Sequence, residues 1–254
     1  MTLFYSITFF VLGLCLGSGM NCLAYRLARG QDWVHGSSVC PSCGAKLTAL
    51  DLVPLFSWLF LGGKCRHCKA KISVRYPLTE LISGLALLVL YRKFGLTLEF
   101  GVDVVLYFCL LALSLVDLDT MEIPNGFLII PAVLRMAFLL WQGGFRGLWY
   151  GVWHSLVLGG AMLLLVLLLE KILKKEAMGG GDIKLLFLLG LFLDLPESLL
   201  LLLFACVIGI LFALLLNGKE SGKAFPFGPA LSLAAMLVIL WGEPIVNAYL
   251  GLFS

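Results

Sequence analysis

Residues 148–169 read LWYGVWHSLVLGGAMLLLVLLL and contain no Lys, Arg, Asp or Glu. A helix needs about 20 predominantly apolar residues to cross the hydrocarbon core of a bilayer. A stretch of this length and composition has no stable place in a water-soluble domain of ordinary size. It therefore predicts a transmembrane helix.

The whole chain has the same character. Of its 254 residues 61% are hydrophobic and 13% are charged, which is about half of the roughly 25% charged residues of an ordinary soluble domain. This composition excludes a soluble enzyme and a nucleic-acid-binding protein. It also excludes a disordered chain, because disorder requires few apolar and many charged residues.

Further apolar runs lie on both sides of this stretch. We predict an all-α polytopic membrane protein with about eight transmembrane helices. The run at 183–195 is short and is expected to be tilted, partial or re-entrant, and full spanning is left open for it and for the tail 245–254. The remaining runs are 3–23, 77–91, 98–116, 123–141, 198–216 and 225–241.

Basic residues indicate the orientation, because they favour the cytoplasmic side of a membrane. If the polar block 24–76 faces the cytoplasm, fourteen of the eighteen basic residues face inward and four face outward. The same alternation of sides places Asp117 and Asp182 at the inner face. The inward set is Arg26, Arg29, Lys46, Lys64, Arg66, Lys69, Lys71, Arg75, Lys171, Lys174, Lys175, Lys184, Lys219 and Lys223.

The polar block contains two Cys-x-x-Cys pairs. Cys40 and Cys43 form the first pair, and Cys65 and Cys68 form the second. Four thiolates in this pattern can close a tetrahedron around a structural zinc ion. Two disulfides are the competing interpretation, which a reducing cytoplasmic location disfavours, and a redox dithiol is a third. A metal would supply folding energy to a block too small to have a core.

Two acidic positions lie where apolar runs end or begin. Asp117 ends one run, in VDLDTMEIPN (116–125), and Asp182 opens another, in MGGGDIK (178–184). Taken singly, each has an ordinary explanation, as an interfacial acid or as a helix N-cap. Two carboxylates close together share one proton, so that one can activate water and the other can polarise a peptide carbonyl. The pair therefore indicates an aspartic protease.

The chain contains a set of motifs in a fixed order: GSGMNCLAYRL (17–27), the two cysteine pairs, RYPLTEL (75–81), Asp117-x6-Pro124-Asn125 and Gly179–Lys184. Together they resemble the prepilin peptidases, which are membrane aspartic proteases of the Gly-x-Gly-Asp type. The resemblance implies removal of the leader of type IV prepilins and type II secretion pseudopilins after a Gly. It also implies N-methylation of the new N-terminus by S-adenosylmethionine. Asp117 and Asp182 correspond to the catalytic pair, and Asp119 does not.

The resemblance also implies a division of the chain. A first transmembrane helix (1–23) precedes a cytoplasmic zinc-binding domain (24–76) and a helical membrane protease domain (77–254). The cysteine-bearing block is associated with the methylating members, and Gly63 and Lys64 match a position linked to methyl transfer. Glu80 is either an acid paired or exposed at the interface, or a contact to the sulfonium of the methyl donor. No nucleotide-binding motif locates that donor.

The implied setting is the bacterial inner membrane, with zinc domain and active site facing the cytoplasm. The expected partners are prepilin or pseudopilin substrates and membrane lipid, and no nucleic acid. Two other interpretations remain open. A transporter would use the acids as an ion site near the bilayer midplane, and a zinc-stabilised assembly scaffold would have no catalytic activity.

Overall fold

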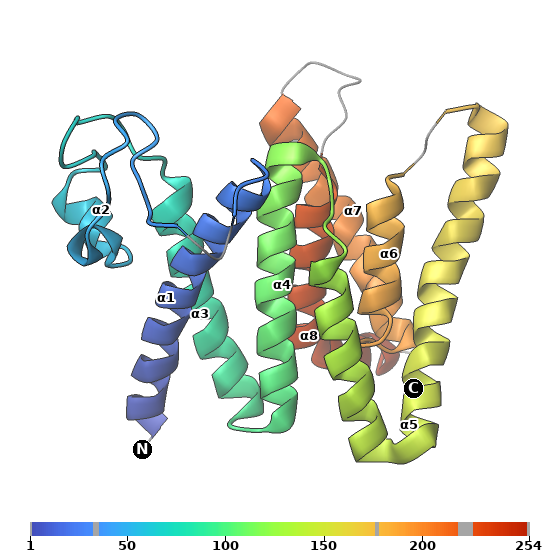
Figure 1. Ribbon diagram of the computed structural model, residues 1–254. Helices are drawn as coiled ribbons and strands as arrows, with labels where there is room; N and C mark the ends of the chain where they lie inside the picture. Colours follow the sequence, from blue (N-terminus) through green and yellow to red (C-terminus); the bar gives the residue numbers. More distant parts are fainter. Residues whose placement is uncertain (1, 33–35, 176–177, 218–225, 253–254) are drawn as a thin grey trace. The chain divides into compact units, whose positions relative to one another are not determined.

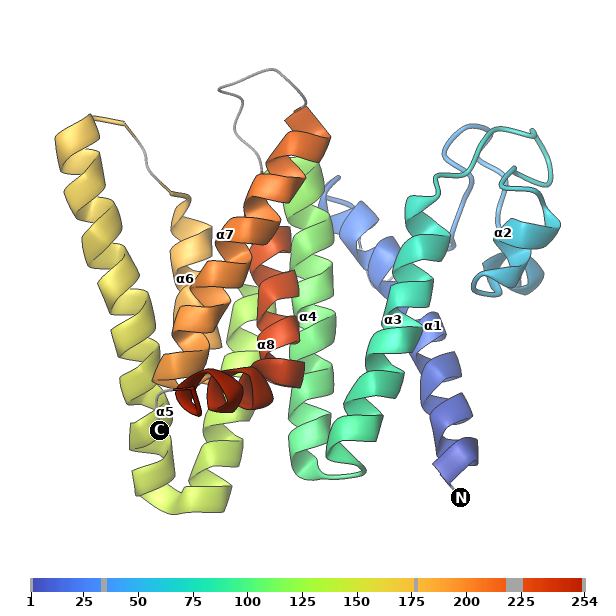
Figure 2. The same cartoon turned by 180° about the vertical axis from the view of Figure 1, so that it is seen from behind.

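The computed structural model describes residues 2–32, 36–175, 178–217 and 226–252 (Figures 1 and 2). Most of these residues form helices with short connections, whereas the described part of the block 28–74 consists mainly of turns and loops with two short helical segments and two isolated β-bridges. Two compact units divide the chain, Met1–Val104 and Val105–Ser254. The elements are α1 (Thr2–Leu27), the 3-10 helix η1 (Ala49–Leu52), α2 (Phe56–Phe60), α3 (Arg75–Phe94), α4 (Leu98–Thr120), α5 (Gly126–Leu173), α6 (Gly180–Leu189), α7 (Leu195–Asn217) and α8 (Gly228–Leu250).

The predicted apolar runs fall on these helices. Helix α5 contains two of them, because Gly144 leaves the helical conformation (φ 58°, ψ −154°) and turns the chain between the runs. Five helices within the described ranges are long and apolar enough to cross a membrane, namely α1, α4, α5, α7 and α8. The all-helical multi-pass class is therefore confirmed, and the number of full crossings stays a prediction. Phe225, Lys219 and Lys223 lie outside the described residues.

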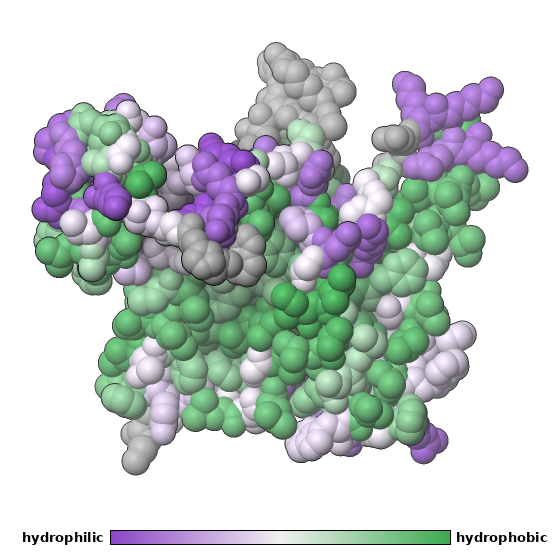
Figure 3. Space-filling view, viewed as in Figure 1, coloured by the Kyte–Doolittle hydropathy of each residue, from purple (hydrophilic) through white to green (hydrophobic). Residues whose placement is uncertain are grey.

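The helix flanks carry the apolar surface that a lipid environment requires (Figure 3). On the second half of α5, Leu164, Leu167 and Leu168 are all more than half exposed. Soluble proteins rarely expose continuous apolar patches of this kind. These side chains are suited to contact with acyl chains.

In the first unit, α1 packs closely against α3. A Cβ on Gly13 would lie 2.5 Å from the carbonyl oxygen of Ser83, and one on Gly17 would lie 2.6 Å from the Ser83 hydroxyl. Small residues four apart allow such backbone contact between membrane helices. Near the end of the pair, the buried Asn21 side chain donates a hydrogen bond to the Thr79 hydroxyl. This packing fixes the two ends of the cysteine block that connects the helices.

In the second unit, the short helix α6 is surrounded by protein. Leu185, Leu186 and Leu189 are almost completely buried, and α6 contacts both α5 and α8. Arg135 of α5 donates a hydrogen bond of 3.1 Å to the carbonyl oxygen of Leu191, just after the helix ends. A ten-residue helix is too short to span a bilayer, so α6 is held in place by its neighbours.

Candidate active site and metal centre

Asp117 lies in the last turn of α4. Its side chain is buried, with 4% of its surface exposed, whereas Asp119 is exposed. The two positions differ because residues two apart point to nearly opposite sides of a helix. The backbone N–H of Gly228, at the start of α8, donates a hydrogen bond of 3.0 Å to Oδ2 of Asp117. This donor stabilises the charged form of the carboxylate and fixes its orientation.

Asp182 lies in the first turn of α6. Its Oδ1 atom is buried and has no hydrogen-bond partner among the described residues. An unsatisfied buried polar atom is costly, and at a helix N-terminus it is a candidate for contact with substrate or water. Burial and, second, the negative charge of Asp117 raise the pKa of Asp182 to about 7. The two carboxyl groups are therefore close enough to interact electrostatically.

The α4–α5 connection brings the two acidic segments together. Ile123 of this connection packs against α6, where a Cβ on Gly181 would lie only 3.0 Å from the Ile123 Cβ atom. The same side chain approaches the first residue of α8, since a Cβ on Gly228 would lie 3.4 Å from Ile123 Cδ1. Lys184 Nζ also donates a hydrogen bond of 3.1 Å to Oδ1 of Asn125. The two predicted motifs thus meet in one site of the second unit.

This site contains residues that the sequence did not single out for a role. Gly228 belongs to FPFGP (225–229), at the start of the apolar run 225–241, and no role was predicted for it. Ile123 was not predicted to have a role, because an isoleucine beside a membrane helix is ordinary.

The positions of the two acids also bear on the transporter interpretation. That interpretation requires acids near the middle of the transmembrane helices, whereas Asp117 and Asp182 lie at helix ends. The transporter interpretation is therefore disfavoured.

The four cysteines of the polar block converge in the first unit. Their Sγ atoms all lie within 4.8 Å of one another, and those of Cys40 and Cys68 are 3.9 Å apart. Tetrahedral zinc with bonds of about 2.3 Å requires sulfurs roughly 3.8 Å apart. All eight cysteines are free thiols, so the disulfide interpretation is not supported. The donor set and spacing fit a structural zinc ion.

Each cysteine pair forms a tight turn whose amides face the first sulfur. Backbone N–H groups of Ser42 and Cys43 lower the pKa of the Cys40 thiol to about 6. Those of Cys68 and His67 lower the pKa of Cys65 in the same way. Lowered thiol pKa values favour the thiolate form, which is the form that binds metal.

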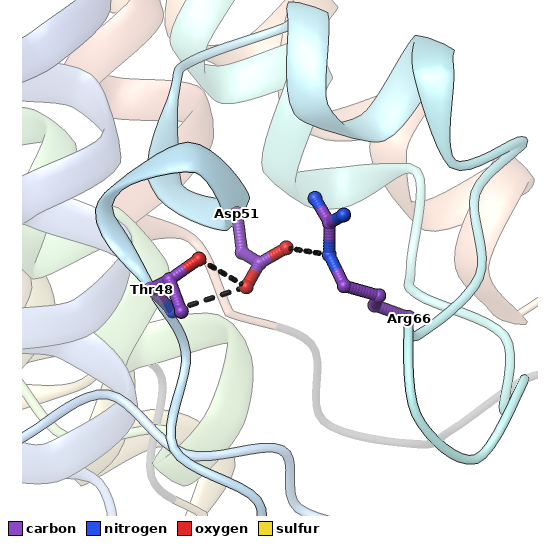
Figure 4. Close-up of polar contacts among 3 residues, drawn as sticks. All are labelled: Thr48, Asp51 and Arg66. Atoms are coloured by element: carbon purple, nitrogen blue, oxygen red, sulfur yellow. Dashed lines mark hydrogen bonds and ion pairs between the residues drawn. The ribbon is translucent and has the colours of Figure 1, made fainter.

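An ion pair attaches the second cysteine pair to η1 (Figure 4). The Arg66 guanidinium donates from Nε to Oδ1 of Asp51 at 2.7 Å. The other carboxylate oxygen of Asp51 accepts hydrogen bonds from the Thr48 hydroxyl at 2.7 Å and its backbone N–H at 3.0 Å. The Thr48 and Arg66 contacts lower the pKa of Asp51 to about 2.

The residues predicted for methyl transfer occupy different environments. Glu80 is buried, and its Oε2 accepts a hydrogen bond of 2.8 Å from the backbone N–H of Leu55. Lys64 is exposed. Gly63 has a positive φ of 67°, and a Cβ there would lie 2.9 Å from the Trp58 ring. Of the three, Glu80 alone lines a cavity of about 480 Å³ in the first unit.

Comparison with known proteins identifies both halves of the chain. Residues 11–94 match the family described as Bacterial Peptidase A24 N-terminal domain, and residues 104–214 match the Type IV leader peptidase family. A relative in Pseudomonas aeruginosa, "Prepilin leader peptidase/N-methyltransferase", is 35% identical to this chain. The alignment covers 94% of this chain and 91% of the relative's length.

Two further relatives carry the same name. The one from Stutzerimonas stutzeri is 34% identical, covering 94% of this chain and 92% of its own, and the one from Bacillus subtilis is 31% identical, covering 95% and 96%. No solved structure matches the chain.

Proposed function

The chain belongs to the bacterial Peptidase A24 family of type IV leader peptidases, and from this premise we propose that Asp117 and Asp182 are its catalytic pair. The activity is that of a prepilin leader peptidase and N-methyltransferase. The chain is a multi-pass membrane protein. The proposed setting is the bacterial inner membrane, with both sites facing the cytoplasm and prepilins or pseudopilins as substrates.

The observation that carries the catalytic proposal is the unequal environment of the two acids. Asp117 accepts a hydrogen bond from Gly228 at the N-terminus of α8. Asp182 has a buried oxygen without a donor and a raised pKa. We therefore assign the negative charge to Asp117 and the shared proton to Asp182, with the pair titrating as a unit.

In this arrangement Asp117 removes a proton from water, and the water oxygen attacks the carbonyl carbon before the cleaved bond. Asp182 donates a hydrogen bond to the carbonyl oxygen and stabilises the charge that develops there. The C–N bond then breaks as the leaving amine takes up the proton that Asp117 removed from water, and this amine becomes the new N-terminus. The bond that is cleaved is expected to be the peptide bond that follows a Gly of the leader.

The four cysteines are proposed to hold zinc in a structural role. A site with four thiolate ligands has no open position for water or substrate. Cys40, Cys43, Cys65 and Cys68 would hold the ion, which cross-links the turns of the polar block and thereby contributes folding energy.

Mass spectrometry of the N-terminus of a co-expressed prepilin tests this function. Wild type should release a product that lacks the leader and is heavier than the unmethylated cleaved prepilin by one methylene group. Asp117→Asn and Asp182→Asn should leave the leader intact. Asp119→Asn is the matched control and should process normally. Zinc content and monodispersity of each purified variant check folding. Processing by both Asn variants would overturn the assignment.

A further inference from the structure

The segment 49–60 of the cysteine block exposes a group of large apolar side chains. Each is between 40% and 86% exposed, and together they form what we call the apolar face: Leu50, Leu52, Val53, Phe56, Leu59 and Phe60. The rings of Phe56 and Phe60 stack with their centroids 6.5 Å apart, so they present one surface. An exposed apolar patch of this kind marks an interaction with a protein or a membrane.

Helix α2 has two different faces. One face lines the cavity of about 480 Å³ and consists of Ser57, Trp58 and, just after the helix, Leu61. The other face consists of Phe56, Leu59 and Phe60, which are spaced three and four residues apart, as one side of a helix requires. The inner face is therefore used by the block itself, whereas the outer face is exposed.

A hydrogen bond fixes the height of α2 along the helices of the first unit, where it lies beside the first turns of α3 (Figures 1 and 2). The backbone N–H of Leu55, the residue before α2, donates a hydrogen bond of 2.8 Å to Oε2 of Glu80. Glu80 lies level with Gly17 of α1, since a Cβ on Gly17 would stand 3.2 Å from the Glu80 Cα atom. Gly17 is six residues before the end of the apolar run 3–23, which is about 9 Å inside it by the rise of an α-helix. The start of α2 therefore lies below the end of this run, at the depth of lipid.

Helix α3 carries a lipid-facing stripe at the same height. Val74, Leu78, Ile82 and Leu85 recur about once per helical turn and are 46% to 61% exposed. Helix α3 packs against α1, which is long and apolar enough to cross a membrane, so this stripe faces acyl chains. The apolar face therefore lies beside a surface that already requires lipid.

The charges of the block also favour a membrane surface. Its part 36–74 contains five basic residues and one acidic residue, namely Lys46, Lys64, Arg66, Lys69, Lys71 and Asp51. All five basic residues are exposed, and the Asp51 carboxylate is paired with Arg66. Basic residues beside a bilayer are attracted to anionic head groups. Apolar side chains together with exposed basic residues are typical of a segment that lies in the membrane interface.

We propose that the apolar face docks on the phospholipid bilayer, with Phe56, Leu59 and Phe60 among acyl chains and the exposed basic residues towards head groups and water. Helix α2 is then an interfacial anchor. It holds the cavity and the four-cysteine cluster at the membrane surface, in addition to their covalent connection to α1 and α3. This placement is independent of the catalytic assignment of Asp117 and Asp182.

Photo-crosslinking in proteoliposomes tests the proposal. The full-length protein with Phe60 replaced by p-benzoylphenylalanine would be reconstituted in phosphatidylethanolamine and phosphatidylglycerol, irradiated and analysed by mass spectrometry. The replacement keeps an aromatic ring at a position that is 86% exposed, and zinc content and monodispersity check that the block is folded. We expect phospholipid adducts at a yield similar to that of the same replacement at Leu78, on the exposed stripe of α3.

The same replacement at Lys46, an exposed basic residue of the block, is the matched control and should give a several-fold lower yield of lipid adducts. If the replacement at Phe60 perturbs the block, Leu59, which is 63% exposed, takes its place in the same experiment. A parallel sample would contain a prepilin. Cross-links to the prepilin or to a second copy of the chain in place of lipid would overturn the proposal, as would a lipid yield no higher than that of the Lys46 control.

Discussion

The backbone N–H of Gly228 donates a hydrogen bond of 3.0 Å to Oδ2 of Asp117, which lies 111 residues earlier in the chain. This contact joins the first turn of α8 to the last turn of α4. The other carboxylate, on Asp182, has a buried oxygen that lacks such a donor. The asymmetry between the two acids is therefore produced by helices far apart in sequence.

Gly228→Ala should strongly reduce leader cleavage. The added Cβ would stand 2.6 Å from Oδ2 of Asp117, so either the carboxylate or the start of α8 must move. A displacement of about 1 Å at reacting groups can reduce the rate roughly 100-fold, and single-turnover cleavage of a prepilin would measure it. Gly160→Ala, whose Cβ meets nothing within 4 Å, should cleave like wild type. A wild-type rate for Gly228→Ala would contradict this explanation.

The two glycines immediately before Asp182 should differ in how well they tolerate substitution by alanine. A Cβ on Gly181 would lie 3.0 Å from Cβ of Ile123, whereas one on Gly180 would meet nothing within 4 Å. We expect Gly181→Ala to lower the rate of leader cleavage by about tenfold, because it should displace its neighbours less than Gly228→Ala does. Gly180→Ala should have little effect on the rate. Adding Ile123→Ala to Gly181→Ala should restore part of the rate. Identical behaviour of the two single variants would show that the Ile123 contact does not position Asp182.

Leader cleavage should decline as the pH rises above about 7. The pKa of Asp182 is raised to about 7 by burial and by the charge of Asp117. Below this value Asp182 keeps the proton that it needs to donate to the carbonyl oxygen, and above it the proton is lost. Initial rates with a saturating prepilin peptide from about pH 5 to pH 9, a range chosen to bracket the value, would measure the profile. A rate that rises throughout this range would contradict the role given to Asp182.

Sequence patterns predicted the parts of the fold that depend on local chemistry. A bilayer requires long apolar helices, so the runs at 98–116 and 198–216 predicted α4 and α7 directly. The two Cys-x-x-Cys motifs predicted a cluster of four cysteines, because each motif forms a turn with two sulfur atoms and the four sulfur atoms lie close together. The helical fold and the four-cysteine cluster were therefore accessible without coordinates.

Other features depend on contacts between distant residues and left no local pattern. The Gly228–Asp117 hydrogen bond and the Ile123–Gly181 contact are examples. The partner of Glu80 was also not predictable, since it is the backbone amide of Leu55 rather than a basic side chain. The cavity was missed for the same reason, because its lining comes from α1, α3 and the loop between them.

Replacing a cysteine of the cluster should remove zinc and weaken methylation. Cys40→Ser supplies a poorer ligand in a closed site, and loss of the metal removes folding energy from the polar block. We expect zinc content, measured by mass spectrometry of the metal, to fall from about one ion per chain to well below half. Cys206→Ser, an exposed position in the other unit, should retain zinc. Full metal content and methylation in Cys40→Ser would contradict the structural-metal assignment.

Asp51→Asn should accelerate zinc release without changing any metal ligand. Arg66 lies within the second cysteine pair, and its 2.7 Å ion pair with Asp51 attaches that turn to η1. Asn keeps an oxygen for the Thr48 contacts but loses the charge, so the turn should open more often and transfer zinc to a chelator several-fold faster. Because Arg66 is half exposed, added salt should screen the pair. Salt should therefore speed release from wild type and have little effect on Asp51→Asn, and an equal response in both proteins would show that the ion pair does not hold the metal turn.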